Sequence, residues 1–180
     1  MDEALSAARA ALREDPDVLV VDDLASAHMV PLLLQAASEG LVFVSITAPS
    51  TIEAVERFVE LAPADARAGV RATMAETFRG AVAQVLLKKS GGGRVAAREV
   101  LLATAAVTRV ISDGSSGQLQ AALEGGRKHG MVPLADALVG LVHSGVVDVR
   151  EAFRKSPDRD RLLAGLKREG IDTSVVERLA

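Results

Sequence analysis

The segment Asp17-Val18-Leu19-Val20-Val21-Asp22-Asp23 decides the fold class of this chain. Its centre, residues 18–21, is a continuous run of Val and Leu, which is typical of a strand buried on both faces in a parallel sheet. Pro16 stands before the run and disfavours helix at Asp15, so the amphipathic stretch before it is expected to form a helix ending near Glu14. The segment therefore predicts an α/β fold with acidic residues at the carboxyl end of its first strand.

A second strand is predicted after one helix. Residues Met29–Glu39 predict a helix, and residues Leu41–Ile46 predict another buried strand. Strand, helix and strand together make one crossover connection between parallel strands. Ser50 and Glu53 have the spacing of a capping box, which predicts a further helix to about Leu61.

A hairpin is predicted in the middle of the chain. A helix is expected to begin at Asp65 and to run to about Ala83. Residues 85–88 and 95–102 then flank Gly91-Gly92-Gly93, and these glycines can supply the positive-φ positions of a turn. The second half of the chain predicts short helices over residues 106–112, 118–123, 133–143, 149–155, 159–168 and 174–179.

The composition limits the classes of function. Nearly half of the 180 residues are hydrophobic (49%), with four Phe and no Tyr or Trp, so an aliphatic core is expected and base stacking is not. The formal charge of −3 gives no general attraction for nucleic acid or an anionic bilayer. Cysteine is absent, which excludes disulfides and thiolate sites. No apolar stretch is long enough to span a bilayer, and we expect a cytoplasmic protein.

The acidic pair Asp22-Asp23 is the main candidate for chemistry. Two carboxylates after a buried apolar strand are typical of nucleotide sites in which one holds Mg²⁺ through water and the other orients the attacking water. Aspartates also end strands for turn chemistry alone, and this alternative stays open.

The glycine-rich segment offers a second candidate. Gly91-Gly92-Gly93 lies among Lys88, Lys89, Arg94 and Arg98, so backbone amides and cations converge there as in a phosphate cradle. The flanking strands favour a hairpin turn with a solvated basic rim, and such a rim can dock an acidic partner. The three histidines, His28, His129 and His143, have no paired spacing, so no metal site is expected.

Four segments carry a resemblance to a known family. They are residues 10–21 (AALREDPDVLVV), residues 86–99 (LLKKSGGGRVAARE), residues 106–111 (AVTRVI) and the turn from Gly125 to Met131. In this order they resemble the PilT branch of the type II and type IV secretion ATPases. Residues 10–21 match its Walker B strand, residues 86–99 match its lysine-and-glycine hairpin, and residues 106–111 stand in the place of its AIRNLI segment. The resemblance covers about residues 5 to 150.

The departures from the family pattern occur at positions that have catalytic roles in the resembling family. A family Walker B strand ends in Gly-Glu, followed by an Arg and an Asp two and three residues past the Glu. This chain has Asp22-Asp23, Ala25 and Ser26 in those places. Thr47 stands where the family has the histidine that senses the γ-phosphate. Asp23 can still polarise a water, with one methylene less than Glu.

The phosphate-binding loop of the family is also missing from these residues. No Gly-x-x-x-x-Gly-Lys-Ser/Thr occurs in the sequence, and the nearest spacing, Gly125 to Gly130, is followed by Met131. The resembling family keeps this loop upstream of the matched region.

The resemblance implies a partial RecA-like P-loop NTPase core over residues 1–104 and a mainly helical region over residues 105–180. It implies the C-terminal part of a pilus or secretion motor that is catalytically silent by itself and acts through subunit or partner contacts. Two alternatives remain: a fragment of an active ATP-hydrolysing retraction motor, and a generic protein-binding module. Mg-ATP is implied for the family, and no cofactor is expected for the isolated chain.

The resemblance also assigns candidate sites and partners. Asp23 takes the catalytic position and Asp22 the position that binds Mg²⁺ or nucleotide. The expected partners are further copies or related motor subunits, and through them the inner-membrane machinery of type IV pili or type II secretion. The residues expected to contact partners are Val107, Thr108, Arg109, Lys88, Lys89 and Arg94.

A further expectation concerns the predicted strands at residues 18–21 and 41–46. Because they are apolar on both faces, something should cover them. The candidates are a second copy, an upstream domain, or the C-terminal helices folding back with the Leu162, Leu163 and Leu166 face.

Overall fold

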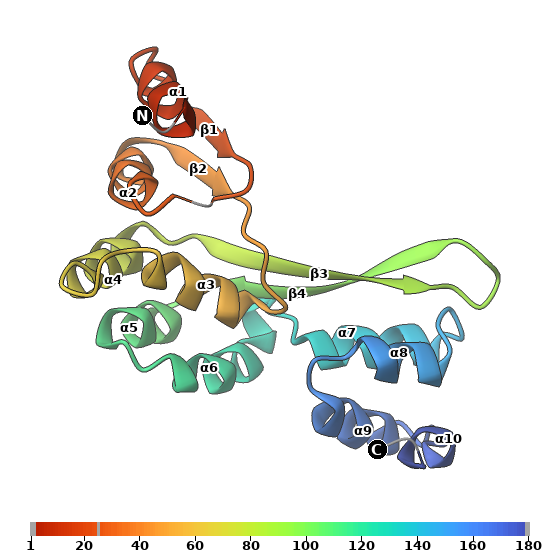
Figure 1. Cartoon of the computed structure of the whole chain (residues 1–180). Helices are drawn as coiled ribbons and strands as arrows, with labels where there is room; N and C mark the ends of the chain where they lie inside the picture. Colours follow the sequence, from red (N-terminus) through yellow and green to blue (C-terminus); the bar gives the residue numbers. More distant parts are fainter. Residues whose placement is uncertain (1–2, 25, 179–180) are drawn as a thin grey trace. The chain divides into compact units, whose positions relative to one another are not determined.

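The computed structural model describes residues 3–24 and 26–178 (Figure 1). The chain forms two compact units that interleave along the sequence. Unit 1 comprises residues up to 48, 52–80 and 103–122, and unit 2 comprises residues 49–51, 81–102 and 123 onward. The two units are defined by contacts in space. The boundary between residues 104 and 105, which the family resemblance implies, therefore stays a prediction.

Unit 1 contains a pair of parallel strands with their helices. The elements are α1 (Glu3–Leu12), β1 (Val18–Val21), α2 (Met29–Glu39) and β2 (Leu41–Val44). Val18 lies opposite Leu41 and Val21 opposite Val44, in parallel register. The predicted crossover is therefore confirmed, although the second strand ends at Val44 and not at Ile46.

The expectation that both strands are buried on both faces is wrong for this chain. The alternate residues Val18, Val20, Leu41 and Phe43 are 50, 69, 42 and 54% exposed. Helix α1 contacts β1 and helix α2 contacts β2, which covers the intervening residues only in part. One face of the pair therefore remains apolar and open to solvent.

The helical part of unit 1 is built from α3 (Thr51–Glu60), α4 (Arg67–Thr77), α5 (Ala105–Asp113), the short η1 (Ser116–Gln118) and the start of α6 (Leu119–Gly125). Helix α4 packs against both α5 and α2. The buried side chains along these helices include Val55, Phe58, Val70, Met74 and Ile111, at helical spacing within each element.

The long helix predicted to reach Ala83 ends earlier. Helix α4 stops at Thr77, because Phe78 turns to an extended conformation with ψ of 130°. Strand β3 (Gly80–Lys88) then begins at a glycine, and β4 (Arg94–Leu102) returns beside it. Gly92 and Gly93 have φ of 89° and 75°, so the glycine turn of the predicted hairpin is confirmed.

Unit 2 places this hairpin against the C-terminal helices. These are α7 (Leu134–His143), α8 (Val149–Lys155), α9 (Arg159–Arg168) and α10 (Ser174–Glu177), preceded by the short η2 (Arg127–His129). The bounds of α8 and α9 agree with the prediction. Residue 179, the predicted end of the last helix, lies outside the described residues.

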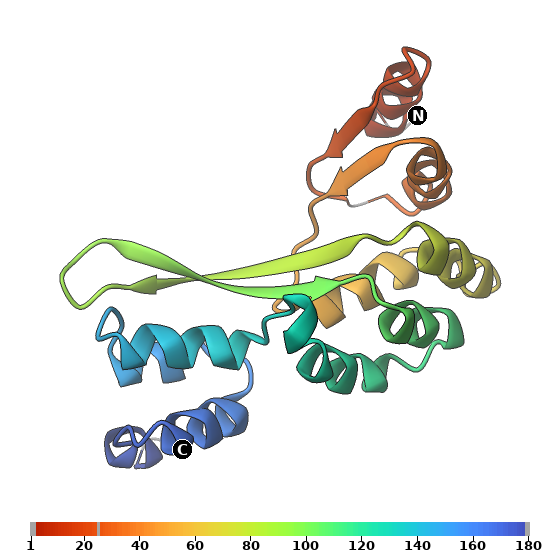
Figure 2. The ribbon, with the colours of Figure 1, turned by 180° about the vertical axis from the view of Figure 1, so that it is seen from behind.

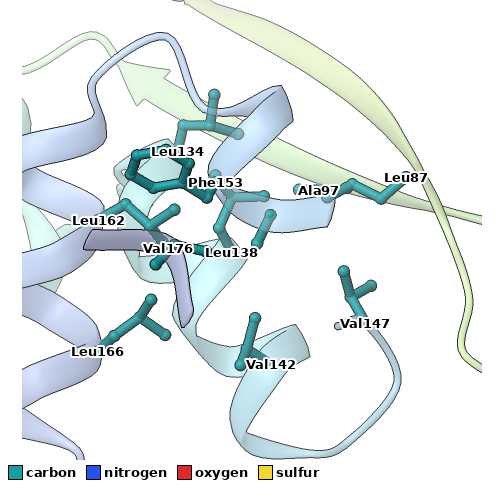
Figure 3. Close-up of a cluster of buried hydrophobic side chains, with 11 residues drawn as sticks. Leu87, Ala97, Leu134, Leu138, Val142, Val147, Phe153, Leu162, Leu166 and Val176 are labelled. Atoms are coloured by element: carbon teal, nitrogen blue, oxygen red, sulfur yellow. The ribbon is translucent and has the colours of Figure 1, made fainter. Parts of the chain in front are cut away.

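The core of unit 2 is an aliphatic cluster with one aromatic ring (Figure 3). Leu87 and Ala97 of the hairpin belong to one cluster with side chains from all four helices, and Leu138, Leu162 and Leu166 are fully buried there. Since Leu162 and Leu166 belong to this cluster, they do not cover the parallel strands. The proposed capping of β1 and β2 by the C-terminal helices is therefore wrong.

The fold class is mixed α/β, with one parallel pair and one antiparallel hairpin. Within the part of the chain that the structure describes, no helix combines the length and hydrophobicity needed to cross a bilayer.

Candidate functional site

The acidic pair lies at the carboxyl end of β1, as predicted, and both side chains are exposed. Ser45, the first residue after β2, ties the two strand ends together. Its hydroxyl donates to Asp22 Oδ1 at 2.5 Å and accepts from the Asp23 amide at 2.7 Å. The Ser45 carbonyl also accepts from the Leu24 amide at 3.0 Å. One oxygen of the Asp22 carboxylate is thus already engaged by a neighbouring strand.

Asp23 has a backbone conformation that few residues adopt. Its φ of 54° lies in the left-handed region, which aspartate tolerates better than most non-glycine residues. The hydroxyl of Ser45 accepts its amide hydrogen, and this bond helps to hold the conformation. The loop after β1 is therefore fixed by a side chain that the sequence analysis did not single out.

A shallow hollow of about 350 Å³ opens beside Asp23. Its charged members are Asp23 and, from α3, Arg57 and Glu60. The Arg57 guanidinium donates to the carbonyl oxygen of Thr47, so the arginine is directed back onto the segment after β2. The full lining is Asp23, Leu24, Ile46, Thr47, Arg57, Glu60 and Leu61.

The hollow lies where α/β proteins usually bind ligands, outside the carboxyl ends of parallel strands. Its residues make an incomplete fit to Mg-ATP. Carboxylates such as Asp22 and Asp23 suit Mg²⁺ bound through water. No three His, Asp or Glu side chains gather into a possible metal site among the described residues. The loop that would hold the β- and γ-phosphates has no counterpart in the sequence.

The positions expected to depart from the family pattern divide between the hollow and its surroundings. Thr47 is exposed and lines the hollow, and its equivalence to the sensor histidine stays a prediction. Ser26 lies in the loop before α2, where its carbonyl accepts from the Met29 amide. Ala25 lies outside the described residues.

The segment of α5 expected to contact partners is split between interior and surface. Val107 is fully buried, and the Thr108 hydroxyl donates to the Thr104 carbonyl within its own helix. The Arg109 side chain is 83% exposed and pairs with Asp113 at 3.6 Å. A partner on this helix would therefore meet Arg109 rather than Val107, and that contact stays a prediction.

The basic rim of the hairpin is exposed and docks on α8 through its backbone. Lys88, Lys89 and Arg94 are all exposed. The Lys88 amide donates to Glu151 Oε1 at 3.0 Å, and the Ser90 amide donates to the Val146 carbonyl at 2.9 Å.

Glu151 is the carboxylate that joins these elements. Its Oε2 also accepts from Arg154 at 2.5 Å, and its side chain is only 12% exposed. The hydrogen bond from the Lys88 amide, together with the bond from Arg154, lowers the pKa of Glu151 below its ordinary value of 4.5.

A buried carboxylate that the sequence analysis missed lies in unit 2. Glu99 on β4 is 5% exposed. Its Oε1 accepts from the amide and the hydroxyl of Thr51 at 2.8 and 2.7 Å, and its Oε2 accepts from the Leu134 amide at 3.2 Å. The only signal in the sequence was a charged residue at an inward position of an alternating strand.

Comparison with curated proteins gives a consistent set of relatives. The chain is 36% identical over 151 residues to the type IV pilus retraction ATPase PilT of Pseudomonas aeruginosa, covering 83% of this chain and 44% of the relative. It is 33% identical over 159 residues to a twitching motility protein of Neisseria gonorrhoeae, covering 87% and 42%. No family model matches the chain.

Comparison with solved structures agrees with the sequence relatives. The crystal structure of the pilus retraction motor PilT with bound ADP superposes with a TM-score of 0.82 at 30% identity, over 91% of this chain and 46% of that one. The ATPase DotB of Yersinia pseudotuberculosis shares the fold, with a TM-score of 0.74 at 22% identity, over 85% and 40%.

The chain spans less than half the length of the curated relatives it matches. In sequence and in fold it is similar to the PilT-like type IV pilus ATPase family, and the similarity covers a part of each relative.

Proposed function

We propose that this chain is the C-terminal part of a PilT-like pilus or secretion motor ATPase, that it is catalytically silent by itself, and that it acts in the cytoplasm through subunit or partner contacts in type IV pilus or type II secretion machinery. The observation that carries the proposal is the state of the acidic site. One oxygen of Asp22 is engaged by Ser45, Thr47 stands where the resemblance implies a histidine, and no phosphate loop occurs among the 180 residues.

The physical argument concerns what a motor needs for hydrolysis. Phosphoryl transfer depends on donors that hold the phosphates and on a cation that neutralises the charge developing on them. Two exposed aspartates at a strand end supply neither a phosphate cradle nor its lysine. The surfaces that remain available for a role in assembly are Arg109 on α5 and the basic rim of the hairpin.

Calorimetric titration with Mg-ATP tests the silent state. We expect no heat of binding in the micromolar range and no release of phosphate. Micromolar binding that disappears in both Asp22→Ala and Asp23→Ala would restore an active nucleotide site. Thr47→Ala is the matched control, since it changes the hollow without removing a carboxylate.

Binding to intact motor subunits tests the role in assembly. A PilT-like motor subunit, titrated with the labelled chain, should bind it with an affinity that falls in Arg109→Glu. Lys128→Glu, an exposed charge reversal outside the proposed surfaces, should bind like the parent. A chain that binds no motor subunit would contradict the role in assembly.

The alternative is a piece of an active retraction motor whose phosphate-binding half lies elsewhere. The specific observation in its favour is that the chain spans only 44% of its Pseudomonas relative. Adding a separately produced phosphate-binding half of a PilT-like motor distinguishes the two. Hydrolysis restored by the mixture and lost in Asp23→Ala would favour the motor fragment.

A further inference from the structure

The basic rim of the hairpin is part of a larger charged surface in unit 2. The tip of the β3–β4 hairpin lies beside the connection between α7 and α8, as both views of the ribbon show (Figures 1 and 2). The bond from the Ser90 amide to the Val146 carbonyl and the bond from the Lys88 amide to Glu151 fix this placement. The backbone of the hairpin tip therefore lies against the start of α8.

Exposed cations of the hairpin and of α8 define this surface. We call it the tip surface and define it as Lys88, Lys89, Arg94, Arg154 and Lys155, which are all exposed. Arg154 pairs with Glu151 and Lys155 lies near enough to lower the pKa of that carboxyl. Among the described residues, no ion pair within 4.0 Å involves the hairpin cations Lys88, Lys89 and Arg94.

Apolar side chains continue the tip surface along the hairpin. Leu86 and Val82 are 49 and 65% exposed, and they alternate with Gln84 on the same face of β3 as Lys88. A partner on this face would meet cations at the tip and aliphatic side chains behind them.

We propose that the tip surface binds an acidic segment of a partner protein. Glu151 already shows the required chemistry within the chain, since its carboxylate accepts from a backbone amide of the hairpin and pairs with Arg154. A partner carboxylate would pair with the side chains of Lys88, Lys89 and Arg94, as Glu151 pairs with Arg154. This inference deepens the proposed function, on which it rests, by naming the chemistry of the partner.

The charge of the whole chain favours a protein segment over an extended polyanion. The formal charge is −3, so a nucleic acid or an anionic bilayer that reached past the tip surface would meet net negative charge. The chain also has no Tyr or Trp for stacking on bases. A short acidic segment can match the tip surface without this repulsion.

Fluorescence anisotropy of the full chain with a labelled peptide of alternating Glu and Leu tests the proposal. We expect binding that weakens with added salt and that is lost when Gln replaces each Glu of the peptide. The triple variant Lys88→Ala, Lys89→Ala, Arg94→Ala should raise the Kd by about tenfold, the sum of three exposed charge contacts. The control triple variant Arg13→Ala, Lys128→Ala, Arg168→Ala removes the same charge elsewhere and should leave the Kd within about twofold.

Three outcomes would overturn the proposal. Equal weakening in both triple variants would mean that the peptide responds to net charge alone. No binding of the peptide would contradict the surface itself. Tighter binding of single-stranded DNA or of phosphatidylserine vesicles, lost in the hairpin variant, would assign the surface to a polyanion. The Mg-ATP titration and the binding of motor subunits through Arg109 are independent of these results, so either proposal can fail while the other stands.

Discussion

The two strand pairs of this chain differ in how their apolar side chains are covered. In unit 2, Leu87 and Ala97 of the hairpin are buried in a cluster to which four helices contribute. In unit 1, Val20 and Phe43 of the parallel pair remain more than half exposed. Both pairs have apolar sequences, so composition alone does not decide burial. The difference teaches that the hairpin belongs to a completed core, whereas the parallel pair has only part of the cover that its sequence predicts.

The largest effect is expected from truncating the completed core. Leu138→Ala should lower the free energy of unfolding by about 2–5 kcal/mol, because it leaves a cavity among fully buried side chains. Val20→Ala should change it by less than about 0.5 kcal/mol, because the Val20 side chain is 69% exposed. Urea unfolding of both variants, followed by circular dichroism, measures the difference. The measurement uses a concentration at which the chain is monomeric, and equal losses there would show that the parallel pair is covered within the monomer.

The next effect concerns the buried carboxylate of unit 2. Glu99→Gln keeps one acceptor oxygen but directs its amide group toward the remaining donor, which is either Thr51 or the Leu134 amide. We expect a loss of about 1–3 kcal/mol in the free energy of unfolding, the range for a buried group left unsatisfied. Hydrogen exchange at the Leu134 and Thr51 amides should accelerate beyond the change in global stability.

Glu76→Gln is the matched control for this substitution. Glu76 is exposed on α4, so the same chemical change should alter stability by less than about 0.5 kcal/mol. Unchanged hydrogen exchange at the Thr51 and Leu134 amides in Glu99→Gln would contradict the role of the Glu99 carboxylate in binding the first residues of α3 and α7.

Local sequence signals predicted much of the fold. The bounds of β1, α2, α8 and α9 agree with the structure, because each is limited by a clear signal such as Gly40 after α2 or Asp158 before α9. The start of β3 was missed. Ala81 and Val82 continue the helical spacing of Met74 and Phe78, whereas the chain leaves the helix at Phe78 and begins the strand at Gly80.

The candidate site was predicted only in part, because its remaining contacts join distant residues. Asp22 and Asp23 were found from their place after an apolar strand. Ser45 contacts them from 22 and 23 positions away, and Glu99 contacts Thr51 across 48. No local pattern predicts which polar residues meet at such separations. Burial of the parallel strands was overestimated because periodicity cannot tell which face finds a partner.

The third prediction addresses the open face of the parallel pair. We expect the chain to associate through the row formed by Val18, Val20, Leu41 and Phe43, because an apolar face beside strand edges favours pairing. Light scattering across a dilution series should show a concentration-dependent mass. The variant Val20→Glu, Phe43→Glu should remain monomeric while losing less than about 1 kcal/mol of stability, since both side chains are exposed. A parent that stays monomeric at all concentrations would contradict association.

The smallest effect is a pH dependence that arises from Glu151 in unit 2. The pKa of Glu151 is lowered mainly by the hydrogen bond from the Lys88 amide and to a smaller extent by the hydrogen bond from Arg154. The unfolded chain therefore takes up this proton at a higher pH than the folded chain does. The stabilisation is present above the ordinary pKa of 4.5 and is lost as the pH falls through the pKa of the folded chain.

Glu151→Gln should lower the free energy of unfolding by less than about 1 kcal/mol at neutral pH, because its partner Arg154 is largely exposed. The difference between parent and variant should shrink as unfolding is measured from neutral pH to below 4.5. A constant difference for Glu151→Gln would mean that its carboxylate does not hold the hairpin on α8 in solution.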